Sequence, residues 1–187
     1  MGMVAVTSRV WSVDEFHAQP ETPGAVAELL DGERLVTPAP RASHQRAVGV
    51  LFRLLASHVE THALGEAFTA PLEVSPDRWT AVQPDLVVFP LVDGRPVADG
   101  EQRTPRLVIE VLSPSTARID RGPKRVLYQR LGADYWIVDL DAQLVEQWAP
   151  AAVSPVICHT EAVWEPVGAP TPFRLELAAY FARVLVG

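Results

Sequence analysis

Two carboxylates lie within strongly apolar stretches of the sequence. Asp85 stands in QPDLVVFP (residues 83–90), and Glu110 stands in LVIEVLSPS (residues 107–115). Burial of an ionised carboxylate is costly unless the charge is paired, hydrogen-bonded or bound to a metal. Two hard oxygen ligands that converge suit Mg²⁺ or Mn²⁺, so Asp85 and Glu110 predict a divalent-metal site. The alternative for Glu110 is a structural ion pair with a nearby arginine.

Lys124 is the only lysine of the chain, and every other basic residue is arginine. A lysine offers a compact charge and a pKa that shifts easily, which arginine does not. We expect Lys124 on the exposed first turn of a helix, where it could orient an attacking water or balance charge on a phosphate. The alternative is that one lysine persists by chance in a composition that favours arginine.

The elements that must position these side chains are strands and helices in mixed order. Residues 85–92 and 106–112 are apolar at consecutive positions, which predicts strands covered on both faces. Asp31-Gly32 predicts a hairpin over 25–36. Further strands are expected over 66–74, 134–140 and 144–150, and helices over 12–20, 41–65, 123–131 and 173–185. The pattern predicts an α/β fold with a central mixed β-sheet flanked by helices, as a single domain over residues 1–187.

Composition and charge narrow the class of protein. The chain has 187 residues, of which 48% are hydrophobic and 21% charged, as in soluble globular proteins. No apolar run approaches the roughly 20 residues that span a bilayer, so we expect no membrane partner. The single Cys158 and the lack of a signal peptide favour a cytoplasmic location.

The net charge of −7 argues against non-specific nucleic-acid binding by the molecule as a whole. Residues 103–130 differ from the rest of the chain, because they contain seven basic residues and only two acidic ones, Glu110 and Asp120. Such a segment is typical of a phosphate-handling site or of a solvated charged face. The basic residues are Arg103, Arg106, Arg118, Arg121, Lys124, Arg125 and Arg130.

Other reactive side chains have simpler explanations. His58 and His62 have the spacing of a helical metal pair, but no third ligand is evident. Cys158 could be a nucleophile, although a small buried residue is favoured. Ser113 and Ser115 lack the glycines of a nucleophile elbow and are typical of a loop after a strand.

Three residues could support the site around Asp85 and Glu110. His44 begins the long helix and either reaches toward the site or caps that helix. Tyr128 and Asp120 lie near Lys124 in the sequence and could orient the residues that do the chemistry.

Three segments together resemble a known family. AELLDGERLVTPAPRASHQRAV (27–48), QPDLVVFP (83–90) and RLVIEVLSPSTARIDRGPKRVLYQRLGADYWIVDLD (106–141) look like the Uma-type bacterial proteins. These proteins belong to the PD-(D/E)XK, or restriction-endonuclease-like, superfamily. The resemblance covers about Val26 to Trp148. It implies a restriction-endonuclease-like fold, a divalent-metal site and cleavage of DNA phosphodiester bonds.

The resemblance also assigns roles to residues. Asp85 fills the Asp of the motif, Glu110 fills its second acidic position, and Glu28 resembles the upstream Glu that completes such sites. The position two residues after Glu110, usually lysine, is Leu112, so Lys124 would supply the amine. The implied protein is a Mg²⁺-dependent (or Mn²⁺-dependent) DNA endonuclease with these four residues as its catalytic set and with Asp85 and Glu110 as metal ligands.

The implied partners are DNA and a second copy of the chain, because cutting two strands favours two sites. Leu112 and the net acidity favour a different class, a non-catalytic module that binds nucleic acid or a protein. A third interpretation is a metal-dependent hydrolase of smaller phosphate esters.

Overall fold

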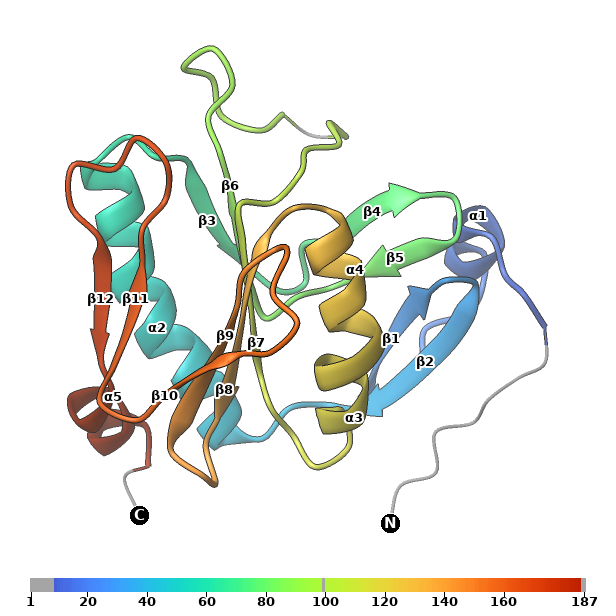
Figure 1. Cartoon of the computed structure of the whole chain (residues 1–187). Coiled ribbons are helices and arrows are strands. Elements are labelled where there is room, and N and C mark those ends of the chain that lie inside the picture. The colour runs from blue at the N-terminus through green and yellow to red at the C-terminus, as the bar shows by residue number, and fades with distance from the viewer. Residues whose placement is uncertain (1–8, 99, 186–187) are drawn as a thin grey trace.

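The centre of the molecule is a six-stranded mixed sheet, seen in a computed structural model that describes residues 9–98 and 100–185 (Figure 1). The strand order is β10-β9-β8-β7-β6-β3. β7 and β8 are parallel, and the other neighbours are antiparallel. The strands are β3 Glu66–Thr69, β6 Leu86–Phe89, β7 Leu107–Val111, β8 Asp134–Asp139, β9 Leu144–Trp148 and β10 Val156–Cys158.

Helices cover both faces of this sheet, as the apolar strands predict. α2 (Ala42–Thr61) and α5 (Leu177–Val184) pack on one face, and α4 (Arg125–Arg130) packs on the other. Alternate residues of β7 belong to different core clusters, with Ile109 on the α2 face and Val108 on the α4 face. Glu110 therefore points to the α4 face. No helix within residues 9–98 and 100–185 has the length and apolarity needed to cross a membrane.

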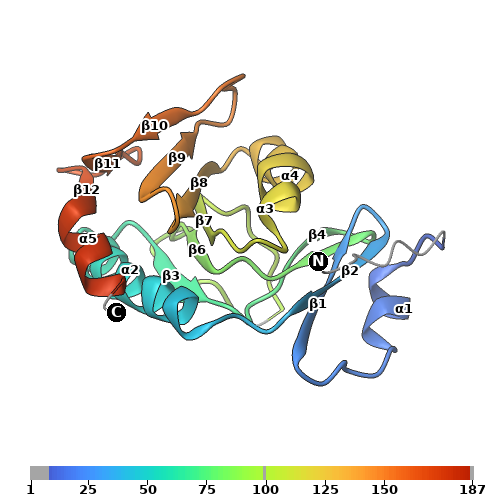
Figure 2. The same cartoon turned by 90° about the horizontal axis from the view of Figure 1, so that it is seen from below.

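Two smaller sheets accompany the central one (Figure 2), so the expectation of one sheet is correct for the core and incomplete for the chain. The first has the order β2-β1-β5-β4 and the second pairs β11 with β12. Asp31 and Gly32 form the expected β1–β2 turn, both with positive φ. These strands are β1 Ala25–Leu30, β2 Glu33–Pro38, β4 Val74–Asp77, β5 Thr80–Val82, β11 Glu161–Trp164 and β12 Phe173–Glu176.

Some elements have other bounds in the structure than the sequence predicts. The short helix α1 (Val13–His17) starts at the capping box of Ser12 and Glu15, as expected. The strand expected over 66–74 ends at Thr69, because Pro71 follows and cannot donate to a ladder. The helix expected over 173–185 starts only at Leu177, and its first four residues form β12.

The connection from β7 to β8 carries the helical segment that lies over the α4 face. The sequence predicts a helix over 123–131, but the segment starts earlier, with α3 (Ala117–Ile119) and a π-helical turn η1 (Asp120–Lys124). Pro123 lies inside η1, where its missing N–H is compatible with a break in the regular hydrogen-bond pattern. Lys124 thus lies in the middle of a helical segment.

Candidate functional site

Asp85 and Glu110 are linked through main-chain hydrogen bonds beside the pairing of β6 with β7. Leu86, the first residue of β6, pairs with Ile109, and Asp85 immediately precedes it. The main-chain N–H of Asp85 donates to Oε2 of Glu110 at 3.2 Å. The main-chain N–H of Val111 donates to Oδ2 of Asp85 at 2.8 Å. Each carboxylate therefore accepts a hydrogen bond from the main chain of the other strand or its lead-in.

Lys124 is buried between two carboxylates. Its Nζ lies 2.9 Å from Oε1 of Glu110 and 2.9 Å from Oε1 of Glu28, and the residue is 4% exposed. The expectation of an exposed first turn is wrong, because the helical segment begins at Ala117 and Lys124 faces the sheet. The alternative of an ion pair at Glu110 is met by the structure with a different cation, because the partner of Glu110 is this lysine and not an arginine.

Glu28 reaches the site from the smaller sheet. It lies in β1, and its Oε1 also accepts the main-chain N–H of Gln83 at 2.7 Å. Gln83 belongs to the link between β5 and β6 that leads into Asp85. The sheet that contains β1 lies beside the central sheet in both views (Figures 1 and 2). The contacts of Glu28 with Lys124 and with the N–H of Gln83 link the two sheets at the site. Its four residues therefore come from β1, the start of β6, β7 and η1.

Negative charge exceeds positive charge in this buried cluster. Burial raises the pKa of Glu110 well above its usual range. Lys124 opposes that rise, while the charges of Asp85, Asp120 and Glu28 add to it. Burial likewise raises the pKa of Asp120 to about 6, against the lowering effect of Lys124. Glu110, Glu28 and Asp120 share this one lysine, and a further cation nearby would favour their charged forms.

Two tyrosines border the cluster. The Tyr128 hydroxyl donates to Oε1 of Glu110 at 3.4 Å, and the Tyr135 hydroxyl donates to the main-chain oxygen of Asp120 at 3.1 Å. Burial raises the pKa of Tyr128 well above its usual value, and the charge of Glu110 adds to it, so the hydroxyl keeps its proton. Burial lowers the pKa of Lys124, but Glu110, Glu28 and Asp120 outweigh it and raise that pKa, so the ammonium keeps its charge.

His44 belongs to the site. It lies in the first turn of α2, whose N-cap is Arg41, so the interpretation of His44 as the cap residue is wrong. Its Nε2 lies 3.1 Å from Oδ2 of Asp85, and its Nδ1 is buried without a hydrogen-bond partner. Burial lowers the pKa of His44, but the hydrogen bond and charge of Asp85 outweigh it and raise that pKa. The sequence placed His44 at a helix start, but the contact depends on how α2 docks on the sheet.

The residues fit a divalent cation by their chemistry. Among residues 9–98 and 100–185 no group of three or more His, Cys, Asp or Glu side chains forms a ready metal cage. An ion at this site would therefore be held by Asp85 and Glu110, with water for its remaining ligands, which is common for Mg²⁺. Both donors are hard oxygens within a cluster of excess negative charge.

The other reactive candidates do not join the site. His58 packs edge-on against His62, whose Nε2 contacts the Thr171 hydroxyl at 3.2 Å. Cys158 is buried, and its Sγ donates to Oε1 of Gln147.

Ser113 is bound within its own turn. Its hydroxyl contacts the hydroxyls of Ser115 and Thr116 at 2.9 and 3.0 Å, in the loop that follows β7. This is the loop start that the sequence favours over a nucleophile.

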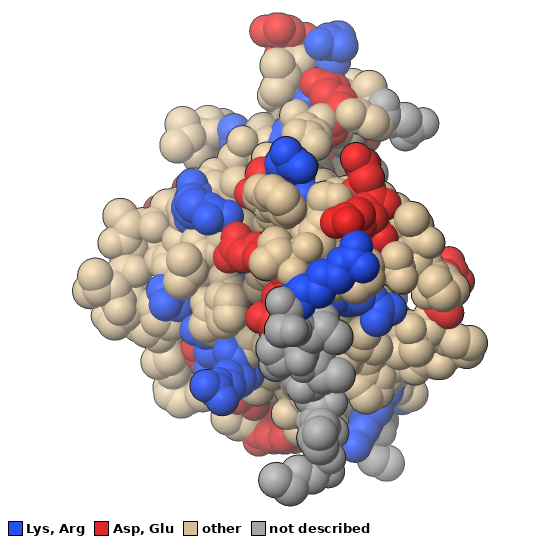
Figure 3. Space-filling model, turned by 90° about the vertical axis from the view of Figure 1, so that its right-hand side faces the viewer, with Lys and Arg blue, Asp and Glu red and all other residues tan. Residues whose placement is uncertain are grey.

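Most of the basic segment is engaged with acidic partners. Arg103 pairs with Glu101, and Arg121 pairs with Asp139 and Glu146. The face of the molecule that carries the small sheet shows acidic and basic side chains interleaved (Figure 3). The described residues of that face therefore present no uniform sign of charge to a polyanion.

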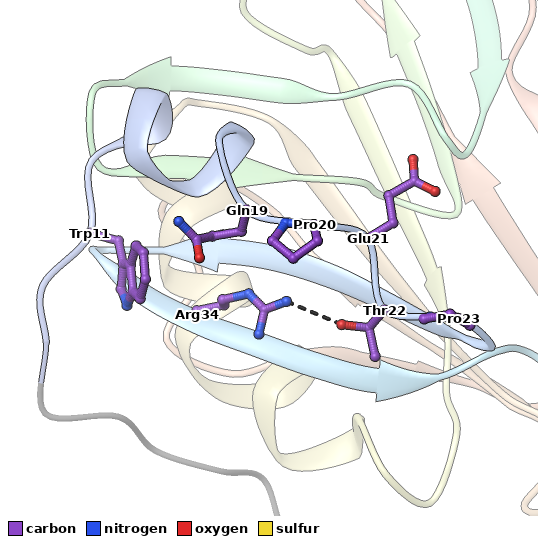
Figure 4. A pocket seen from close by; sticks show the side chains of 7 residues that line it. All are labelled: Trp11, Gln19, Pro20, Glu21, Thr22, Pro23 and Arg34. Atoms are coloured by element: carbon purple, nitrogen blue, oxygen red, sulfur yellow. Dashed lines mark hydrogen bonds between the residues drawn. The ribbon is translucent and has the colours of Figure 1, made fainter.

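A surface hollow of 180 Å³ has Asp85 in its wall. A larger one of 360 Å³ is lined by Trp11, Arg34 and the segment 19–23, and Arg34 donates there to the Thr22 hydroxyl (Figure 4). Arg34 pairs with Leu29, the neighbour of Glu28 in β1, so it lies on the opposite face of the hairpin from Glu28. The larger hollow is therefore separate from the carboxylate cluster.

Comparison with known proteins shows a family and a similar solved structure. Residues 13–177 match the model of the Uma2 family, described as "Putative restriction endonuclease". A crystal structure from Anabaena variabilis, described as "a putative nuclease belonging to DUF820", is similar with a TM-score of 0.77 and 22% sequence identity. The similarity covers 94% of this chain and 99% of that one, and it shows a shared fold. A comparison with curated proteins found no match.

Proposed function

This chain belongs to the Uma2 family, and from that membership we propose that it is a Mg²⁺-dependent DNA endonuclease that also accepts Mn²⁺. The observation that carries the proposal is the pairing of Asp85 and Glu110 on adjacent strands, with Lys124 at the Glu110 carboxylate. These are the residue types that phosphodiester hydrolysis by an activated water requires. The restriction-endonuclease-like fold supports the same reaction class.

Each residue has a role in the proposed reaction. Asp85 and Glu110 would hold the metal, and when bound it would supply Lewis-acid chemistry toward a water molecule and the phosphate. Lys124 positions that water or stabilises charge that develops on the phosphate. Glu28 aids binding of the metal or the water and holds Lys124 at 2.9 Å. Leu112, at the position where the superfamily has its lysine, leaves the amine role to Lys124.

The second candidate is a non-catalytic module that binds nucleic acid or a protein. The observation that favours it is the double ion pair of Lys124 with Glu28 and Glu110, which neutralises part of the site without any ligand. In such a module the cluster would be structural, and DNA would bind without being cut.

The test is incubation of the purified protein with supercoiled, linear and single-stranded DNA in Mg²⁺ or Mn²⁺. We expect metal-dependent strand cleavage that Asp85→Ala abolishes and that Asp31→Ala, a change in an exposed turn, leaves intact. Metal-dependent thermal stabilisation without cleavage of any DNA form would favour the non-catalytic module. Cleavage that persists in Asp85→Ala would contradict the proposed site.

The assembly around this activity is also proposed. We expect residues 1–187 to act as one domain, in the cytoplasm, as a homodimer whose two sites cut the two strands of a duplex. Light scattering after size-exclusion chromatography measures the dimer directly, and a monomer that nicks one strand would contradict it.

A further inference from the structure

A cavity of 180 Å³ adjoins the carboxylate cluster on the α2 side. It lies between the first turns of α2 and the end of β3, and Asp85 forms part of its wall. The main-chain N–H of Ala70 donates to the main-chain oxygen of Asp85 at 3.3 Å, so these two lining residues are hydrogen-bonded to each other. The lining residues are Gln45, Val48, Gly49, Thr69, Ala70 and Asp85.

The chemistry of the wall selects the kind of group that fits. Asp85 is its one charged side chain, and its negative charge disfavours a phosphate inside the cavity. Val48 and Gly49 supply an apolar surface, while Gln45 and Thr69 supply donors and acceptors. An apolar surface with a few polar groups suits a flat, neutral ring with polar edges. The volume is below the roughly 300–1,000 Å³ of pockets for drug-sized ligands, so it suits one ring system.

Gly49 lines the cavity without a side chain. It lies within α2, where glycine destabilises a helix relative to alanine, and its φ is not in the left-handed region. A Cβ at this position would meet only Nη1 of Arg53, at 3.8 Å, which is ordinary contact. The backbone therefore does not require glycine here, and what glycine provides is the space that a side chain would fill.

We propose that this cavity receives the nucleoside next to the scissile phosphate and that the Gln45 amide contacts the edge of its base. The inference rests on the proposed nuclease function, because a phosphate bound through a metal ion at Asp85, outside the cavity, would bring its neighbouring nucleoside to this wall. Gln45 is exposed at the start of α2, and its amide offers the paired donor and acceptor that can distinguish one base from another.

The test uses a variant that fills the cavity and leaves Asp85 and Glu110 unchanged. Gly49→Leu places a side chain in the cavity, and Ser57→Leu places the same side chain on an exposed turn of the same helix. The probe is a fluorescein-labelled oligonucleotide whose binding is followed by anisotropy in Ca²⁺. We expect Gly49→Leu to weaken binding roughly tenfold or more, equivalent to at least about 1.4 kcal/mol, while Ser57→Leu binds like the parent.

Two further measurements make each outcome decisive. Metal-dependent thermal stabilisation should be equal in Gly49→Leu and the parent, because Asp85 and Glu110 are unchanged. If Gly49→Leu does not fold, Gln45→Ala replaces it, since Gln45 is exposed, and should alter relative affinity for oligonucleotides that differ in one base by about tenfold. A folded Gly49→Leu that binds like the parent, or a Gln45→Ala with unchanged base preference, would overturn the subsite.

The nuclease proposal fails by a different result. A parent protein that binds the oligonucleotide but never cuts it would contradict the proposed function, and loss of that binding in Gly49→Leu would still support the cavity. A parent that binds no oligonucleotide would overturn the subsite as well.

Discussion

Lys124 and Glu110 form a buried ion pair in which Nζ lies 2.9 Å from Oε1 and each side chain is 5% exposed. The same ammonium lies 2.9 Å from Glu28, so one lysine neutralises two carboxylates from different sheets. A charge in this position holds the two sheets together, and its removal leaves negative charges buried without a partner.

Lys124→Met should therefore destabilise the fold strongly. Loss of one partner from a buried ion pair costs on the order of 3–5 kcal/mol, and here two carboxylates lose their partner. Urea unfolding at pH 7 measures the change in the free energy of unfolding. Arg118→Met, at an exposed position of the same segment, is the control and should change it by less than about 0.5 kcal/mol. A Lys124→Met variant as stable as the parent would mean that Glu110 carries a proton instead of a charge.

Asp120→Asn should remove part of the pH dependence of stability. The pKa of Asp120 is about 6 in the folded state against a usual 3.8, so between these values the folded state binds more protons than the unfolded state. The contribution of Asp120 to the free energy of unfolding is fully present below about pH 4 and is lost as the pH rises to about 6. The loss amounts to about 3 kcal/mol if the shift is fully expressed.

Thermal or urea unfolding from pH 4 to pH 7 tests this expectation. Asp120→Asn should gain stability relative to the parent as the pH rises through that window, while Asp141→Asn, at an exposed turn, should follow the parent. A constant difference between Asp120→Asn and the parent across the window would show that Asp120 is not protonated in the folded state.

Glu110→Gln should reduce metal-dependent stabilisation. An ion that binds only the folded state adds RT ln(1 + [L]/Kd), about 2.7 kcal/mol at a hundredfold excess over Kd. Glutamine keeps the shape of Glu110 and removes the charge that attracts the ion. The control is Glu146→Gln, because Glu146 is also a buried carboxylate of the central sheet, paired with Arg121. Scanning calorimetry measures the Mn²⁺-dependent rise in Tm. An equal rise in Glu110→Gln and in the parent would mean that the ion binds elsewhere.

His44→Ala should weaken metal binding without loss of the fold. His44 and the Val111 N–H both contact Oδ2 of Asp85, which fixes the direction of that carboxylate. Loss of such an orienting partner typically costs about 10–100-fold in metal affinity. A Mn²⁺ titration of thermal stability measures it, with His44→Gln, which keeps an N–H donor, expected between the parent and His44→Ala. Exposed His17→Ala is the control, and equal titrations for all four proteins would rule out this role.

The antiparallel pairing of β6 with β7 could be predicted, because two apolar strands linked by a loop commonly pair in this way. The hydrogen bond from the Asp85 N–H to Glu110 lies next to that pairing. The α2–sheet–α4 layering follows in the same way from strands that are apolar on both faces.

The burial of Lys124 could not be predicted from the sequence. Its direction depends on where the helical segment begins, and the segment starts at Ala117 with a π-helical turn that has no pattern of its own. The contacts of Glu28 depend on how the β2-β1-β5-β4 sheet docks against the central sheet, and those of His44 depend on how α2 docks there. Such long-range contacts are set by packing, and local sequence patterns do not encode them.

The position of Glu28 has a consequence for synthesis of the protein on the ribosome. β1 and β2 form a local hairpin that emerges early, whereas the lysine that neutralises Glu28 emerges only after the whole central strand β7. Until then, docking of the hairpin would bury a carboxylate without a counter-charge, so the nascent hairpin should stay in water. Hydrogen exchange of stalled nascent chains would show its protection only after residue 124 has left the exit tunnel. The carboxylate cluster thus gains its counter-charge only once Lys124 has emerged, so a nascent chain that ends before Lys124 would lack the cutting centre of the proposed nuclease.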